Sequence, residues 1–260
     1  MIMRKPGHIT ASTRRASLGL PAQIGASLFD LDGVLTRTAD VHRAVWAEVF
    51  DALLAERAGG DSFRGFTEAD YLTYVDGRPR RDGVRAFLGS HGIELPGGDP
   101  DDPPSFATVA GVANRKNERG LERFRTDGVA VFDGSVRYVE AVRSAGLRTA
   151  VVTASANAAT VLEAAGIDEQ FDVLVDGMVA ARERLAGRPA PDTFLVPAEA
   201  TGVPPAEAAV FEDALAGVAA GRAGGFGYVV GVDRAGQAAA LRVHGADIVV
   251  TDPSDLLERP

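Results

Sequence analysis

The amino-acid sequence predicts an α/β protein with a parallel sheet and an inserted helical domain. The stretch Ser27–Leu31 has the length and the bulky apolar side chains of a short buried strand. Between residues 40 and 126 only helical patterns occur, whereas helices and strands alternate regularly from residue 135 to residue 250. Such alternation is typical of a parallel sheet with right-handed crossovers, so the helical block interrupts the sheet after its first strand.

These patterns divide the chain into three parts. We expect the sheet domain to comprise residues 24–37 and 128–260, and the helical domain to comprise residues 38–127. Residues 1–23 are basic, rich in Ser and Thr, and without periodicity. We expect them to form a flexible N-terminal tail, with a packed N-terminal arm as the alternative.

The helical domain begins with a long helix. Apolar residues recur at intervals of three and four from Asp40 to Arg57, and Thr38 or Asp40 is the expected N-cap. Residues 91–104 are rich in Gly, Pro and Asp and are expected to form a loop. Further helical patterns occur at 67–75, 80–90 and 106–125.

The second part of the sheet domain is expected to alternate between helix and strand. The predicted helices are 135–145, 157–165, 192–202, 214–223 and 235–244. The predicted strands are 147–153, 172–175, 209–212, 227–232 and 247–250.

Composition excludes several classes of protein. The 260 residues suffice for a buried core, and the formal net charge of −9 argues against a nucleic-acid partner. The absence of cysteine excludes disulfides, thiolate catalysis and Cys-based zinc sites, and it fits a reducing cytosol. No apolar run approaches the ~18 residues of a membrane helix, and none follows Arg4 and Lys5 as a secretory signal requires. We therefore expect a cytoplasmic protein without a membrane partner.

Two carboxylates follow the first predicted strand. Side chains alternate in direction along a strand, so Asp30 and Asp32 would share one face if both lay within it, and Gly33 then ends the strand. The carboxyl ends of strands are where open α/β sheets bind their ligands. A bound Mg²⁺ would relieve the repulsion between the two acids, and one could act as a nucleophile while the other moves a proton. A solvated turn is the alternative; a calcium loop is excluded because its twelfth position is Val41 rather than Glu.

Three later segments place polar side chains at strand ends or before a helix. Thr153 ends a strand and offers a hydroxyl to a phosphoryl oxygen, although a strand-end Thr is more often structural. Arg188 lies between Gly187 and Pro189, where it would be either a fixed cation for phosphoryl charge or a surface residue of a turn. Glu212 and Asp213 end another strand and would complete the metal site or simply cap the next helix.

Together, these four segments resemble the four motifs of the haloacid dehalogenase superfamily of phosphoryl-transfer enzymes, and the resemblance spans residues 24–252. It implies a Rossmann-like core with an α-helical cap. It also implies Asp30 as the nucleophile, Asp32 as the general acid and base, and Thr153 and Arg188 as groups that neutralise phosphoryl charge. The implied Mg²⁺ ligands are the side chains of Asp30 and Asp213 and the backbone carbonyl of Asp32, with Glu212 bound directly or through water.

Within the superfamily, the chain is most similar to the β-phosphoglucomutase subfamily. That similarity implies substrate contacts from Thr38, His42, Gly77, Arg80, Lys116, Asn117, Ala154, Ser155 and Asn157. A cap-packing role for His42 and a solvated surface for the cations are the alternatives. The sequence departs from the subfamily at four positions, where Arg188, Asp76 and Ala156 replace Lys and Arg37 replaces Asp.

The resemblance implies a specific reaction. A β-phosphoglucomutase converts β-glucose 1-phosphate into glucose 6-phosphate, with glucose 1,6-bisphosphate as activator. A phosphatase for sugar phosphates or other small molecules is the alternative, because it uses the same four motifs. A non-catalytic module is disfavoured because Asp30 is intact. We expect a monomer whose partner is a small phosphorylated sugar.

Overall fold

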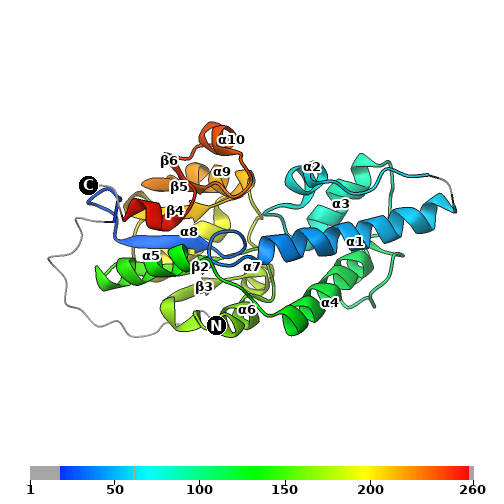
Figure 1. Ribbon diagram of the computed structural model, residues 1–260, viewed down its shortest axis with the longest axis horizontal. Coiled ribbons are helices and arrows are strands. Elements are labelled where there is room, and N and C mark those ends of the chain that lie inside the picture. Colours follow the sequence, from blue (N-terminus) through cyan, green and yellow to red (C-terminus); the bar gives the residue numbers. More distant parts are fainter. Residues whose placement is uncertain (1–17, 61, 258–260) are drawn as a thin grey trace. The chain divides into compact units, whose positions relative to one another are not determined.

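The computed structural model describes residues 18–60 and 62–257 (Figure 1). The chain forms two compact units, one made of the residues up to Arg37 and from Val129 onwards, the other of Thr38–Gly128. Most of the predicted N-terminal tail, residues 1–17, lies outside the described residues. Leu18 is already buried, and its carbonyl accepts a hydrogen bond of 2.8 Å from the hydroxyl of Tyr138.

The first unit is built on the expected parallel sheet. Its six strands lie in the order β3-β2-β1-β4-β5-β6, and every neighbouring pair is parallel (Figure 1). The strands are β1 (Ala26–Asp30), β2 (Arg148–Val152), β3 (Val173–Val175), β4 (Ala208–Glu212), β5 (Tyr228–Val232) and β6 (Ile248–Val250). Each lies within one residue of its predicted bounds. Because β1 is flanked by β2 and β4, the carboxyl ends of these three strands meet at one edge of the sheet.

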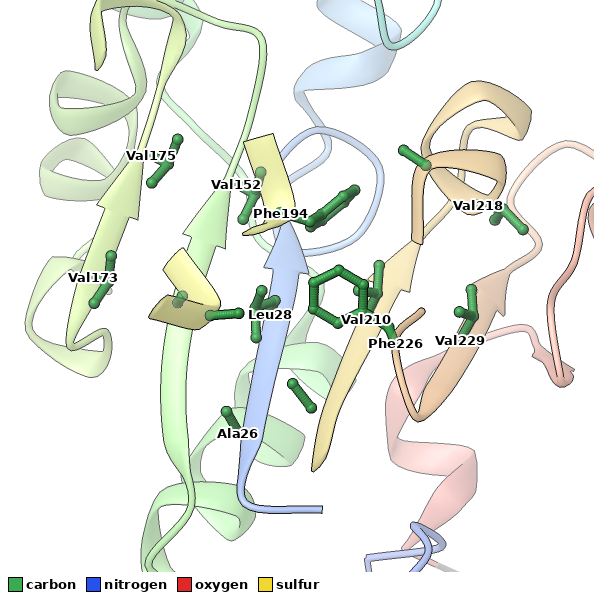
Figure 2. Packing of buried hydrophobic residues seen from close by; sticks show 14 of the residues in the cluster. Ala26, Leu28, Val152, Val173, Val175, Phe194, Val210, Val218, Phe226 and Val229 are labelled. Carbon is green, nitrogen blue, oxygen red and sulfur yellow. The ribbon is translucent and has the colours of Figure 1, made fainter. Parts of the chain in front are cut away.

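Strand β1 is buried on both faces, which explains its continuous apolar run. Figure 2 shows Leu28 beside Phe194 and Val210 on one face, in a cluster that also includes residues of β3 and β5. On the opposite face, the ring of Phe29 stacks on that of Phe211 with 4.5 Å between centroids. The strand that carries Asp30 is therefore held rigidly from both sides.

The helices of this unit are α5 (Asp133–Ser144), α6 (Ala158–Ala164), α7 (Gly177–Glu183), α8 (Asp192–Thr201), α9 (Leu215–Ala223) and α10 (Ala238–Val243). Helix α7 was not predicted; it has seven residues, and its N-terminus is fixed by the side chain of Asp176, which accepts from the N–H of Val179 at 2.8 Å. Helix α10 is shorter than predicted because the Asp233 carboxylate accepts from the N–H groups of Gln237 and Ala238 and delays the first turn.

The second unit contains only helices and loops in its described part, as the sequence predicts. It consists of α1 (Thr38–Ala58), α2 (Glu68–Asp70), a π-helical turn (Tyr71–Val75), α3 (Arg80–Ser90) and α4 (Val109–Asp127). Helix α1 begins at Thr38, so both predicted N-cap residues lie in its first turn instead. Trp46 is buried and its ring stacks on that of Phe50, whose centroid lies 4.0 Å from the centroid of the Phe87 ring.

The segment predicted as helical at 67–75 consists of the short helix α2 followed by the π-helical turn, and a capping box fixes its start. The Asp70 carboxylate accepts from the N–H and hydroxyl of Thr67, and the Thr67 hydroxyl accepts from the Asp70 N–H. Arg64 forms two hydrogen bonds with the same carboxylate and, with Thr67, lowers the pKa of Asp70 to about 2. No helix in the described part of the chain is both long and apolar enough to cross a membrane.

Candidate active site

Three carboxylates gather at the carboxyl edge of the sheet. Asp30 is the last residue of β1, Glu212 is the last residue of the neighbouring strand β4, and Asp213 follows it. One carboxylate oxygen from each lies within 4.8 Å of the others, and both Asp30 and Glu212 are buried. A donor set made only of carboxylates is the kind that hard divalent cations prefer.

Asp32 reaches this edge through a turn rather than through the strand. Strand β1 ends at Asp30, so the expectation that both acids share a strand face is wrong. The turn is closed by hydrogen bonds from the N–H of Leu35 to the carbonyl of Leu31 and from the N–H of Gly33 to the carbonyl of Thr36. The turn thus determines where Asp32 points.

Gly33 allows the turn to approach the next acidic residue closely. Its φ of +88° lies in the left-handed region that favours glycine. A β-carbon on this residue would collide with Oδ2 of Asp213. The absence of a side chain at this position therefore lets the Asp213 carboxylate lie directly against the turn that carries Asp32.

Thr153 is the first residue after β2 and lies beside the same turn. Its hydroxyl donates to Oδ2 of Asp32 at 3.3 Å and accepts from the N–H of Ser155 at 3.1 Å. Ala154, Ser155 and Asn157 follow in the loop before α6, and the Ser155 hydroxyl accepts from the N–H of Asn157. The structure therefore groups these predicted substrate residues with Thr153.

Arg188 is buried among the carboxylates. Its Nη1 lies 2.7 Å from Oδ1 of Asp30 and 2.9 Å from Oε2 of Glu212, and its Nη2 donates to the carbonyl of Val152 at 2.9 Å. Burial by itself would lower the pKa of Arg188, but Glu212 and Asp30 outweigh that effect and raise it. The guanidinium also lies over the ring of Phe194, 4.9 Å from its centroid. The arginine that replaces the expected lysine is thus a fixed, permanently charged group.

In the helical unit, His42 of α1 and Lys116 of α4 form a pair. Lys116 Nζ lies 2.6 Å from His42 Nδ1, so the ammonium donates to an imidazole nitrogen that carries no proton. Lys116 is buried and also lies over the ring of Trp46, while the His42 ring meets Phe124 edge-on. Two other predicted substrate residues adjoin this pair in the chain: Thr38 is buried in the first turn of α1, and Asn117 follows Lys116.

Arg80 opens helix α3 after a turn that contains Gly77, whose φ is +69°. The guanidinium nitrogen Nη1 of Arg80 is buried and has no hydrogen-bond partner among the described residues. Burial lowers the pKa of Arg80, because the charged form is disfavoured away from water. A buried cationic donor of this kind is stabilised by an anionic ligand.

The site also includes residues that the sequence patterns did not reveal. Arg234 and Gln237 follow β5 and donate to the carbonyls of Gly33 and Asp213. The one available signal was their place directly after a predicted strand, at the edge of the sheet where ligands bind.

Comparison with known proteins shows the family to which the chain belongs. The sequence model of the haloacid dehalogenase-like hydrolase family matches residues 24–225, so the chain belongs to this family and is an enzyme of the haloacid dehalogenase superfamily. The family resemblance seen in the sequence is therefore confirmed.

Individual relatives extend the match to nearly the whole chain. Proteins named β-phosphoglucomutase from Mycobacterium bovis and from Mycobacterium tuberculosis are each 56% identical to it over 250 residues, which cover 94% of this chain and 95% of each relative. Among solved structures, the β-phosphoglucomutase of Clostridium difficile is similar with a TM-score of 0.71 and 25% identity, over 90% of this chain and 93% of that one.

Proposed function

We propose that the chain is a β-phosphoglucomutase that converts β-glucose 1-phosphate into glucose 6-phosphate through an aspartyl phosphate. The observation that carries this proposal is the 56% identity, over nearly the full length, to two proteins of that name. The buried acidic and basic groups at the sheet edge support it, because each has a place in phosphoryl transfer.

Asp30 is the nucleophile of this reaction. The Arg188 guanidinium, 2.7 Å from Oδ1 of Asp30, forms a charged contact with this carboxylate and restricts its motion. An Asp30 oxygen forms a bond to phosphorus while the bond from phosphorus to the sugar oxygen breaks. Arg188 also offers positive charge to the phosphoryl oxygens, and Thr153 offers its hydroxyl.

Asp32 is the general acid and then the general base. In its acid role it gives a proton to the sugar oxygen that leaves phosphorus. In the reverse direction it takes the proton of the sugar hydroxyl that attacks the phosphoenzyme. The phosphoenzyme first phosphorylates the C6 hydroxyl of β-glucose 1-phosphate to give glucose 1,6-bisphosphate. The C1 phosphoryl group of this intermediate then returns to Asp30, and glucose 6-phosphate leaves.

The carboxylate cluster fits a Mg²⁺ cofactor. Asp30, Glu212 and Asp213 supply hard oxygen ligands within a small space, and Gly33 leaves room for the Asp213 carboxylate against the turn. The Asp32 backbone carbonyl is a further ligand in this proposal. Bound Mg²⁺ supplies positive charge that offsets the negative charge of the transferred phosphoryl group.

In this proposal, residues of the helical unit bind the parts of the substrate that do not react. Arg80 binds the phosphate that is not reacting, which would satisfy its buried Nη1. Lys116, with His42 and Asn117, binds substrate oxygens. The remaining predicted contacts are Thr38, Gly77, Ala154, Ser155 and Asn157.

A sugar-phosphate phosphatase remains the second candidate function. Two positions favour it, because Ala156 and Asp76 stand where the mutase subfamily has lysine. Each replacement removes a cation from the segments that would hold the second phosphate. A phosphatase needs no such hold, because water rather than a sugar hydroxyl accepts the phosphoryl group.

The product formed by the wild-type enzyme decides between the two. With β-glucose 1-phosphate, Mg²⁺ and catalytic glucose 1,6-bisphosphate, we expect glucose 6-phosphate to accumulate far faster than inorganic phosphate. A coupled glucose 6-phosphate assay and a phosphate assay on the same samples measure both products. Release of inorganic phosphate without glucose 6-phosphate would establish the phosphatase instead.

The metal site gives a second test. We expect Asp213→Ala to weaken Mg²⁺ binding by about tenfold or more, and more than Glu212→Ala does. A 2.9 Å ion pair ties Glu212 to Arg188, whereas Asp213 lies in the loop after β4 with its carboxylate directly against Gly33, so Asp213 is the stronger candidate for a direct ligand. Calorimetric Mg²⁺ titration of metal-free protein measures both affinities, and Asp168→Ala, an exposed aspartate, is the control. Full activity in excess chelator would contradict the metal site.

A further inference from the structure

The loop between β5 and α10 contacts both the turn that carries Asp32 and the loop that carries Asp213. Arg234 Nε donates to the carbonyl of Gly33 at 2.9 Å, the residue directly after Asp32. Gln237 Nε2 donates to the carbonyl of Asp213 at 3.0 Å. Gly33 and Asp213 themselves lie close enough that no β-carbon fits between them. A single short loop therefore holds the backbone of both Gly33 and Asp213, the two residues that lie against each other.

The position of Arg234 is fixed by several contacts besides its hydrogen bond to Gly33. Its Nη1 donates to the carbonyl of Thr251 at 2.6 Å, and its Nη2 lies 3.4 Å from both Ser135 and Asp252. Its guanidinium lies over the ring of Phe132, with 3.6 Å from Cζ to the ring centroid. These contacts use the planar fork of the guanidinium, so its Nε–H points at Gly33 in one defined direction.

The loop is also anchored to the sheet. The N–H of Asp233 donates to the carbonyl of Val250 on β6 at 2.8 Å, and the Asp233 carboxylate accepts from the backbone of Gln237. Residues 233–237 are thus tied to the edge of the sheet at one end and to the first turn of α10 at the other. Because these hydrogen bonds restrict the motion of the loop, its side chains can keep Gly33 and Asp213 in fixed positions.

We propose that Arg234 and Gln237 are positioning residues of the active site: Arg234 orients Asp32 through the carbonyl of Gly33, and Gln237 holds the Asp213 loop in the geometry that binds Mg²⁺. This inference rests on the proposed roles of Asp32 and Asp213. It does not depend on whether the final phosphoryl acceptor is a sugar or water.

The test of Arg234 uses two leaving groups. A sugar or alkyl oxygen needs a proton from Asp32 as it leaves phosphorus, whereas a nitrophenolate leaves without one. For both substrates kcat/KM reports formation of the phosphoenzyme. Arg234→Met keeps the long stem and removes the donors, so we expect kcat/KM to fall about 100-fold for an alkyl or sugar phosphate and less than about tenfold for the aryl phosphate.

A matched variant separates positioning from general damage. Arg137→Met makes the same substitution in an arginine that reaches Ser254 at 3.4 Å, and we expect it to leave both substrates unaffected. Arg234→Lys, which keeps the charge and one donor, should restore part of the loss and serves as the test if Arg234→Met does not fold. Equal losses on both substrates in the Arg234 variants, or the same pattern in Arg137→Met, would overturn the role of Arg234.

Gln237 has a separate readout. Gln237→Met keeps the shape of the side chain but removes the donor to Asp213, so we expect Mg²⁺ affinity to fall about tenfold while the alkyl-to-aryl ratio stays as in the wild type. Calorimetric titration with Mg²⁺ alone measures this without turnover. Unchanged Mg²⁺ affinity would overturn the role of Gln237. A wild-type enzyme that releases only inorganic phosphate would refute the mutase proposal and leave both of these comparisons valid.

Discussion

Replacing Asp30 with Asn is expected to abolish turnover while the protein remains folded. An amide cannot form the acyl phosphate, so the reaction loses its covalent intermediate and the rate should fall by about 10⁴-fold or more. Folding should survive because the amide has nearly the same size. Arg188 also keeps its second carboxylate, Glu212, at 2.9 Å, so the buried cation is not left alone. Mutase assays and thermal unfolding of the same sample measure the two effects.

The Asp30→Asn sample must be checked for protein that has reverted to aspartate. Deamidation would convert the new amide back to the original carboxylate and restore activity, so intact mass must be measured on the assayed sample. Asp168→Asn makes the same change at an exposed aspartate and should be fully active. Turnover near the wild-type rate in an undeamidated Asp30→Asn sample would rule out Asp30 as the nucleophile.

Replacing Arg80 with Ala is expected to change the ratio of two activities. A mutase must hold the phosphate that is not reacting while the bisphosphate turns round, and Arg80 offers a buried donor for it. Loss of a charged hydrogen bond is worth about 1.5–3 kcal/mol, so isomerisation of β-glucose 1-phosphate should slow by about 10- to 100-fold. Hydrolysis of an aryl phosphate, which has no second phosphate, should fall much less.

A neighbouring arginine provides the comparison. Arg85 lies on the same helix α3 and forms an exposed ion pair with Asp82 at 3.0 Å, so Arg85→Ala should leave both activities and their ratio unchanged. Both rates are measured on one preparation, the isomerase rate by a coupled assay and the hydrolysis rate by absorbance. Equal losses of the two activities in Arg80→Ala would show that Arg80 does not bind the second phosphate.

Local sequence patterns were sufficient to predict most of the fold. Strand β1 is a continuous apolar run because both of its faces are buried, and such a run is visible in the sequence itself. Alternating helices and strands leave few alternatives to a parallel sheet. Helix α7 escaped prediction because seven residues beginning with Gly177 make too little of a 3.6-residue pattern, and its start depends on the side chain of Asp176.

The candidate site was predictable where its residues end strands. Asp30, Thr153 and Glu212 each stand at the carboxyl end of an apolar run, and a parallel sheet aligns these ends at one edge. Asp32 marks the limit of this reasoning. Alternation of side chains predicts the direction of Asp32 only if Asp32 lies in the strand. Strand β1 ends two residues earlier, at Asp30, so a turn determines the direction of Asp32.

The sequence alone determined the strands, most of the helices and the acidic residues at the strand ends, since those follow from local periodicity and residue chemistry. The tertiary structure alone decided which distant residues meet. Arg188 meets Asp30 because α8, the helix that Arg188 precedes, packs against β1 and β2. Lys116 reaches His42 because α4 packs beside α1. Arg234 reaches Gly33, 201 positions away, because only β4 separates β5 from β1 in the sheet. No local pattern records such a contact, because it depends on how the whole sheet is ordered.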